Sequence, residues 1–235
     1  MEYIIPKNIE GFPDVKSVFT TRLMPDPMRI LEKGINRIVT AEQRHSDKVV
    51  VIESRESRVE SRKSGVRGQI EADALITKER GLLIGVHVAD CVPILIYDSS
   101  TPAVAAVHAG WRGTAKEILK KTLREMNQSF GTSMIHVFIS IGPSIRGCCY
   151  EVGEEVVKAL NGSGIRSRGS EKYFVDLTEI NRIQAIKIGV KESNIWFSSE
   201  CTFHNPERFF SYRYQQKNNG KDVGRQGGFI GLVNI

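Results

Sequence analysis

The sequence predicts a mixed α/β fold in a single domain, with helices packed outside mixed β-sheet. The chain of 235 residues has the length of one domain and can bury a substantial core. Short apolar runs of strand length outnumber helical patterns, and several successive runs are joined by connections too short for a crossover helix. This pattern favours a mixed sheet over a doubly wound parallel one. No long linker or break in composition marks a second domain.

The first half of the chain consists mainly of predicted strands. These strands are expected over Val15–Thr21, Ile35–Thr40, Lys48–Glu53, Ile70–Thr77, Val92–Tyr97 and Ala103–Val107. Two prolines, Pro25 and Pro27, predict a turn followed by a short helical piece. The stretch 53–67 repeats a Glu-Ser-Arg theme without an apolar period, which is typical of a solvated hairpin tip or loop.

The second half contains the predicted helices. A helix should open at Gly113 and Thr114, because Thr114 and Glu117 form a capping-box pattern and apolar residues then recur with helical period up to Met126. Two more helices, Glu154–Leu160 and one capped by Asp176 and running to Ile188, and four strands, Ile135–Ile141, Phe174–Asp176, Ile195–Ser198 and Phe229–Val233, are expected further on.

Composition excludes several classes of function. The net charge is +6, but 33 basic residues are scattered among 27 acidic ones, so the pattern favours small anionic substrates over nucleic acid. The sequence has no apolar run of membrane-spanning length and no signal-peptide pattern at its start, so no membrane partner and a cytoplasmic location are expected. Neither a GxxxxGK[ST] motif nor a GxGxxG motif after a strand is present.

The residues with reactive side chains gather around the stretch 84–114. Cys91 immediately precedes the predicted strand Val92–Tyr97, and His108 immediately follows Ala103–Val107. If these strands pair antiparallel, Cys91 and His108 become neighbours at one end of a sheet. A thiolate beside an imidazole can provide two ligands of a metal site, or it can act as a nucleophile–base pair. Residue spacing alone leaves both readings open.

A third residue would decide between these readings. For zinc, His45 is the best third ligand because it lies in a polar loop near a strand end, whereas His87 is expected to pack in the core. His136 and His204 are weaker candidates. For a cysteine hydrolase, Asp73 or Asp90 would orient His108 as the base.

The turn after His108 and the remaining cysteines also carry expectations. The HAGWRG turn lies at a predicted helix N-terminus, where free N–H groups and Arg112 would favour an anion, and Trp111 is expected to shield the turn. Four cysteines without a disulfide-framework spacing are expected to be thiols. Cys148, Cys149 and Cys201 are interpreted as packed thiols.

Five segments resemble, in order, the signature blocks of a known family. They are ADALIT (72–77), VADCVPILIYD (88–98), AVHAGWRGT (106–114), IGPSIRGCCYEVG (141–153) and FFSYR (209–213). The chain therefore resembles the YfiH family, also called the multicopper polyphenol oxidase or laccase-like family and, more recently, the purine nucleoside phosphorylase YfiH family. The resemblance implies a layered α-β-β-α sandwich. It also implies a metal centre, usually zinc, with His45 of the Gln43-Arg44-His45 loop, Cys91 and His108 as ligands.

The resemblance also implies an activity. Family members are associated with phosphorolysis of adenosine, inosine, guanosine and methylthioadenosine and with deamination of adenosine. Older laccase assignments, and a peptidoglycan-editing role in some bacteria, are also attached to the family. The implied partners are a purine nucleoside and phosphate, with the protein a monomer or small homo-oligomer. Asp73 and Asp90 are candidate catalytic acids, and Arg22, Gln43, Arg112 and Arg225 are candidate substrate or phosphate contacts.

Two further points bear on the metal and the substrate. Five histidines cannot furnish the several copper centres of a true laccase, although a single copper could occupy the zinc site. The chain departs from the family pattern at LMPDPM after Arg22, at Ser46 in QRHS and at Tyr214 in SYRY. These departures fall on loops that are expected to contact substrate.

Overall fold

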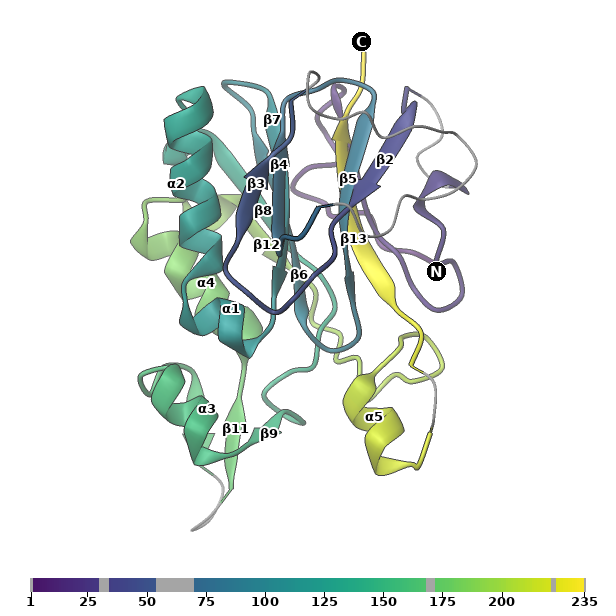
Figure 1. Ribbon diagram of the computed structural model, residues 1–235, viewed down its shortest axis with the longest axis vertical. Coiled ribbons are helices and arrows are strands. Elements are labelled where there is room, and N and C mark those ends of the chain that lie inside the picture. The colour runs from purple at the N-terminus through teal and green to yellow at the C-terminus, as the bar shows by residue number, and fades with distance from the viewer. Residues whose placement is uncertain (1, 30–33, 54–69, 168–171, 221–222, 235) are drawn as a thin grey trace.

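Two mixed β-sheets stacked face to face form the body of the computed structural model (Figure 1). The structure describes residues 2–29, 34–53, 70–167, 172–220 and 223–234. The larger sheet has six strands in the order β12 (Ile195–Phe197), β8 (Val137–Ile141), β6 (Val92–Asp98), β7 (Ala103–Ala109), β4 (Ala74–Thr77) and β3 (Val49–Val51). The smaller sheet has four strands in the order β1 (Val15–Phe19), β13 (Gln226–Leu232), β5 (Leu82–Val88) and β2 (Arg37–Thr40).

Both sheets contain parallel and antiparallel pairs. In the larger sheet β12 pairs with β8 and β3 with β4 in parallel, and the other pairs are antiparallel. In the smaller sheet only the β2–β5 pair is parallel. The mixed α/β fold class expected from the sequence is therefore confirmed.

The apolar runs are continuous because the strands are buried on both faces. In β6, Ile94 and Ile96 pack toward the helices, whereas Leu95 and Tyr97 pack into the core between the sheets. Successive side chains of a strand point to opposite faces, so a strand with apolar neighbours on both faces needs no polar alternation. The core between the sheets is completed by residues such as Ile84 from the smaller sheet.

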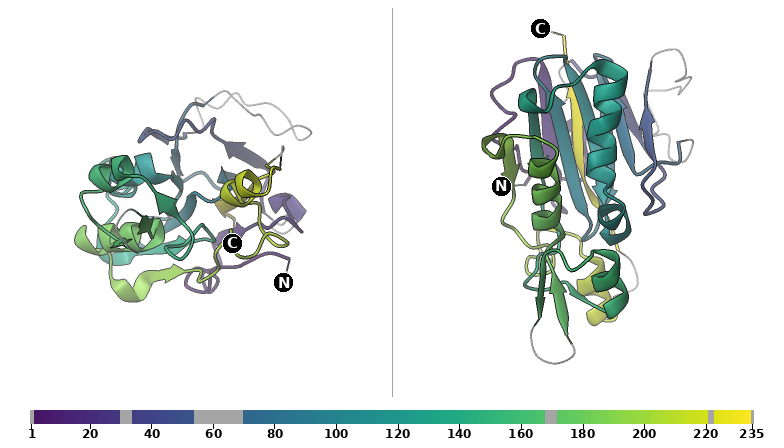
Figure 2. Two further views of the ribbon diagram at one scale, coloured as in Figure 1. Left: turned by 90° about the horizontal axis from the view of Figure 1, so that it is seen from below. Right: turned by 90° about the vertical axis from the view of Figure 1, so that its left-hand side faces the viewer.

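Helices cover the outer face of the six-stranded sheet (Figure 2). They are α1 (Trp111–Ala115), α2 (Ile118–Phe130) and α4 (Leu177–Lys187). On the outer face of the four-stranded sheet, a small cluster around Val18 and Phe229 packs with Met28 of the 3-10 turn Pro27–Arg29. Within the described residues, no helix combines the length and hydropathy that a bilayer crossing requires.

Smaller elements gather at one end of the two sheets, where Figure 1 shows α3 and α5. They are α3 (Glu154–Ala159), α5 (Tyr212–Lys217) and a three-stranded sheet of β10 (Ile165–Ser167), β11 (Tyr173–Val175) and β9 (Glu151–Val152). Two 3-10 turns, Met134–His136 and Glu192–Asn194, precede β8 and β12. The elements α5, β9 and β10 have no counterpart among the predicted elements, because they are short and lack a clear apolar period.

The predicted capping box is wrong. The helix begins at Trp111 after Gly110, and it is interrupted at Glu117, whose backbone is left-handed with a φ of 58°. A second helix, α2, starts at Ile118, and the Glu117 carboxylate pairs with Lys120 instead of capping a helix start. By contrast, the Asp176 side chain does cap α4 by accepting from the Glu179 N–H. Of the predicted loop 53–67, residues 54–67 lie outside the described residues.

Candidate active site

Strand register brings Cys91 and His108 together at one end of the six-stranded sheet. β6 and β7 pair antiparallel, with Pro93 opposite His108 and Val92 opposite Ala109. Cys91 immediately precedes Val92, in the tight turn that joins β5 to β6. The expected neighbourhood of the thiol and the imidazole is therefore confirmed.

His45 approaches the same point from the loop between β2 and β3. Its backbone has a φ of 56°, a left-handed conformation that is uncommon for a residue with a side chain. One ligand atom from each of His45, Cys91 and His108 lies within 4.8 Å of the other two. The rings of His45 and His108 meet edge to face, with centroids 4.8 Å apart.

The Asp73 carboxylate holds this arrangement in place. It is fully buried and accepts three consecutive backbone N–H groups, from Arg44 (3.2 Å), His45 (3.0 Å) and Ser46 (2.7 Å). It also accepts the Ser46 hydroxyl at 2.6 Å and lies 2.7 Å from Nδ1 of His108. Because Nδ1 is engaged by Asp73, Nε2 is the nitrogen of His108 that remains for a ligand.

Opposite charges and hydrogen bonds stabilise the charged forms of Cys91, His108 and Asp73. Burial alone would raise the pKa of the Cys91 thiol, but the neighbouring imidazoles outweigh it and lower the pKa to about 6. Burial would lower the pKa of His108, but Cys91 and Asp73 raise it to about 9. Burial likewise opposes the ionisation of Asp73, yet hydrogen bonds from His108 and Ser46 bring its pKa down to about 2. The site therefore favours a thiolate, which is the form that binds metals and attacks electrophiles.

Gly110 leaves room for the cluster. A Cβ atom at this position would lie 3.1 Å from Sγ of Cys91 and 3.3 Å from Cδ2 of His45. Because such contacts are tighter than ordinary van der Waals packing, any side chain here would push against two of the three candidate ligands.

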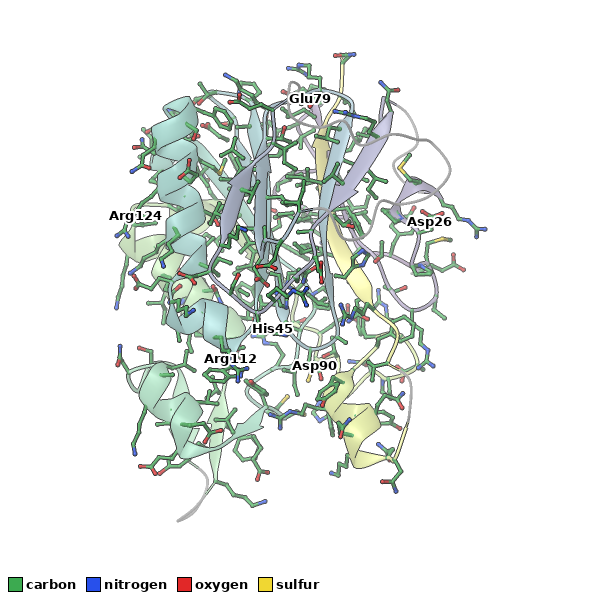
Figure 3. The ribbon with its side chains drawn as sticks, viewed as in Figure 1. Asp26, His45, Glu79, Asp90, Arg112 and Arg124 are labelled. Carbon is green, nitrogen blue, oxygen red and sulfur yellow. The ribbon has the colours of Figure 1, made fainter. Side chains whose placement is uncertain are left out.

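The cluster opens into a cavity of about 380 Å³. Figure 3 shows His45, Asp90 and Arg112 close together at the end of the sheets where α1 begins. Three arginines, Arg112, Arg213 and Arg225, line the cavity, as do the aromatic side chains of Trp111, Tyr150 and Tyr212. The guanidinium group of Arg112 lies over the Trp111 ring, 4.2 Å from its centroid.

Asp90 lines the same cavity beside Cys91. Its backbone has a φ of 87°, and its carboxylate accepts the Thr202 hydroxyl at 2.6 Å and the Arg213 N–H at 2.7 Å. These bonds connect the β5–β6 turn to the segment around Thr202 and to the start of α5.

Two expected site residues lie elsewhere. Among the described residues that line the cavity, Arg22 and Asp73 are absent. Arg22 instead donates to the carbonyl of Pro206 at 2.9 Å and stacks on Phe210. Asp73 lies behind His108. These positions do not support Arg22 as a phosphate contact or Asp73 as a group that touches substrate.

Gln43 and His87 both line the cavity. The Gln43 amide exchanges two 2.8 Å hydrogen bonds with the backbone of His87, which fixes the His45 loop to β5. His87 was expected in the core, but it is half-buried and lines the cavity, with its ring against Phe229. Tyr150, Tyr212 and Arg213 also line the cavity, although they were not among the predicted site residues.

The chain is similar in sequence to proteins of a known family. The family model described as "Multi-copper polyphenol oxidoreductase laccase" matches residues 27–233. A "Purine nucleoside phosphorylase" of Bacteroides thetaiotaomicron is 43% identical over 148 residues, which cover 60% of this chain and 55% of that relative. "Adenosine deaminase RL5", from an unknown prokaryotic organism, is 36% identical over 196 residues, covering 80% of this chain and 73% of that relative.

Solved structures agree in fold. The crystal structure of the hypothetical protein YfiH from Bacillus licheniformis has a TM-score of 0.84 at 25% identity and covers 99% of this chain and 97% of that one. YlmD from Geobacillus stearothermophilus has a TM-score of 0.81 at 27% identity and covers 95% of this chain and 93% of that one. The resemblance stated from the sequence is thus confirmed by the family model and by the structural similarity to YfiH. The chain belongs to the multi-copper polyphenol oxidoreductase laccase family.

Proposed function

We propose that this protein is a zinc-dependent purine nucleoside phosphorylase that also deaminates adenosine. One observation carries the proposal: a cluster of two imidazoles and one thiolate opens into the same cavity as Arg112, Arg213 and Arg225. The names of the relatives, purine nucleoside phosphorylase and adenosine deaminase, support the reaction class.

The residues at the cluster fit a zinc ion. Three protein ligands with a fourth position open to a cavity are the form of a catalytic zinc site, and His45, Cys91 and His108 would supply the ligands. The Asp73–His108 contact is the carboxylate–histidine pair that commonly orients metal ligands. When bound, zinc supplies a Lewis acid that polarises an oxygen atom placed at the open position. The same set of donors could also hold a single copper ion.

The remaining cavity residues suit a nucleoside and phosphate. The volume of about 380 Å³ lies within the range of small-molecule pockets. A guanidinium group can donate two parallel hydrogen bonds to two oxygens of one phosphate, so Arg112 and Arg225 are the proposed phosphate contacts. The rings of Trp111, Tyr150 and Tyr212 offer apolar faces for a purine.

Asp90 is the proposed group that moves a proton in deamination. It lies beside Cys91 and faces the cavity. Each of its carboxylate oxygens accepts one hydrogen bond and keeps a further lone pair.

A nucleoside panel with and without phosphate, combined with metal analysis, tests the proposal. We expect base release from inosine or guanosine to require both phosphate and zinc, and ammonia release from adenosine to require zinc but not phosphate. Phosphate-dependent base release that survives complete removal of zinc would show the metal mechanism to be wrong.

A cysteine hydrolase is the second candidate, because Cys91, His108 and Asp73 also lie in the order of a nucleophile, base and orienting acid. A peptidoglycan-editing amidase would be one such enzyme. The substitution His45→Ala separates the two proposals. A zinc enzyme should lose zinc and turnover, whereas a cysteine hydrolase should keep its activity and lose it only when Cys91 is alkylated.

A further inference from the structure

We propose that Cys148, Cys149, Cys201 and His204 form a second metal site, which holds one thiophilic divalent cation, with zinc as the favoured ion. Cys148 and Cys149 follow β8 in the loop that leads to β9, and Cys201 and His204 follow β12. The site differs from the candidate active site in its residues, its loops and its ratio of sulfur to nitrogen.

The side chains already converge. One ligand atom from each of the four residues lies within 4.8 Å of the other three. The Cys149 sulfur is 3.1 Å from Nε2 of His204, and the Cys148 sulfur is 3.8 Å from Nδ1 of the same ring. In a tetrahedral zinc site with bonds of about 2.3 Å, neighbouring ligand atoms are about 3.8 Å apart. Small side-chain rotations would therefore close the four residues around an ion, with one nitrogen of His204 as its ligand.

The backbone holds the two loops in register. Ser144 and Cys201 form a parallel bridge, and the Thr202 N–H donates to the Ser144 carbonyl at 3.1 Å. The Arg146 N–H points at the Cys201 sulfur at 3.4 Å, and the Asn205 amide donates to the Cys201 carbonyl at 2.9 Å. These contacts fix the position of Cys201 relative to the loop that carries Cys148 and Cys149.

The chemistry of the four side chains selects the ion. Thiolate and imidazole ligands suit zinc, whereas magnesium and calcium require oxygen ligands. A set of three cysteines and one histidine fills a tetrahedral zinc shell, which is the form of a structural site rather than a catalytic one. An ion here would stabilise the fold without joining the reaction.

The structural consequence reaches the cavity wall. The loop that carries Cys148 and Cys149 also places Ile145 and Tyr150 in the cavity lining. The loop that carries Cys201 continues into Thr202, whose hydroxyl donates to Asp90. The proposed ion would fasten together two loops that shape the substrate cavity and hold Asp90.

Solvent exposure makes the site testable. Cys148 and His204 are exposed, so Cys148→Ser and His204→Ala should leave the packing of the core intact, unlike substitution of the buried Cys201. The expected wild-type content, measured on full-length protein purified under reducing conditions, is about two zinc ions per chain. Each exposed variant should lose one ion, as should Cys91→Ser at the other site. His136→Ala, which alters an exposed histidine outside both clusters, should lose none.

Cobalt substitution identifies which site each variant has lost. The sulfur-to-cobalt charge-transfer band grows with the number of thiolate ligands, so cobalt remaining in Cys91→Ser should absorb roughly three times as strongly per ion as cobalt remaining in His204→Ala. The proposal would be overturned if Cys148→Ser and His204→Ala kept the wild-type zinc content. Disulfide-bonded Cys148 and Cys149 in freshly reduced, zinc-supplemented protein would also overturn it.

Discussion

The substitution Asp73→Asn tests whether the buried carboxylate sets the affinity of the proposed active-site zinc. The change preserves shape but replaces one acceptor oxygen with an NH2 donor. One oxygen of Asp73 accepts from the His45 N–H and faces Nδ1 of His108, and the other accepts from Arg44 and Ser46. In either orientation of the amide, at least one backbone N–H therefore faces another donor.

The magnitude follows from these contacts. A buried donor left without an acceptor costs about 1–3 kcal/mol. Loss of a carboxylate that orients a metal-bound histidine typically weakens metal binding about 10–100-fold, or about 1.4–2.8 kcal/mol. We therefore expect Asp73→Asn to fold with reduced stability, to bind zinc about 10–100-fold more weakly and to lose turnover in proportion to the zinc lost.

The assay is a zinc competition titration against a chromophoric chelator, with thermal unfolding of the zinc-free protein alongside. Asp98→Asn is the matched control, because Asp98 is equally buried and accepts hydrogen bonds from Ser100 and Thr101 at the far end of β6. Both variants should lose stability, but only Asp73→Asn should lose zinc affinity. Equal zinc affinities in Asp73→Asn and wild type would refute the positioning role of Asp73.

Three further predictions concern the cavity and the core. Gly110→Ala should fold but bind zinc more weakly in the same titration, because its Cβ would lie 3.1 Å from the sulfur of Cys91, a proposed ligand. Unchanged zinc affinity would show that the proposed ligands can shift. Arg112→Met should raise the KM for phosphate about tenfold or more with zinc retained, whereas Arg22→Met, outside the cavity lining, should change it little, as steady-state kinetics would show. Burial opposes ionisation of Asp98, but hydrogen bonds from its neighbours lower its pKa. The contribution of Asp98 to stability is therefore fully present above its ordinary pKa of 3.8 and is lost as the pH falls through the lower pKa of the folded state. Denaturant unfolding across this acid range should show a shallower loss in Asp98→Asn than in wild type.

The strands could be predicted from the sequence because a strand that is buried on both faces consists of consecutive apolar residues. Val92–Asp98 and Ala103–Ala109 emerge almost as expected, and their antiparallel register follows from the short connection between them. Helix boundaries were harder to place, since the interruption at Glu117 depends on a left-handed backbone residue that no local pattern signals. The short α5 carries no buried residue, so it leaves no apolar period in the sequence.

The cavity residues also differ in whether the sequence could predict them. Arg112 follows a strand end within a distinctive turn and could be singled out from the sequence. Tyr150, Tyr212 and Arg213 could not, because they enter the cavity from irregular loops whose course depends on tertiary contacts such as Arg213 N–H to Asp90. The expectation that Cys148 is a packed thiol is wrong for a similar reason: Cys148 is exposed, and the loops place it against His204.

The His45 loop shows why the third candidate ligand required more than spacing. Its approach to Cys91 and His108 depends on a left-handed residue, which costs backbone energy, and on three successive N–H groups that need an acceptor. Asp73 answers both requirements, since one carboxylate binds the three N–H groups and also faces His108 from the neighbouring strand. An acid inside an apolar run was thus the sequence signal that the site existed. This acid contacts two of the candidate ligands, His45 and His108, which lie on separate segments of the chain.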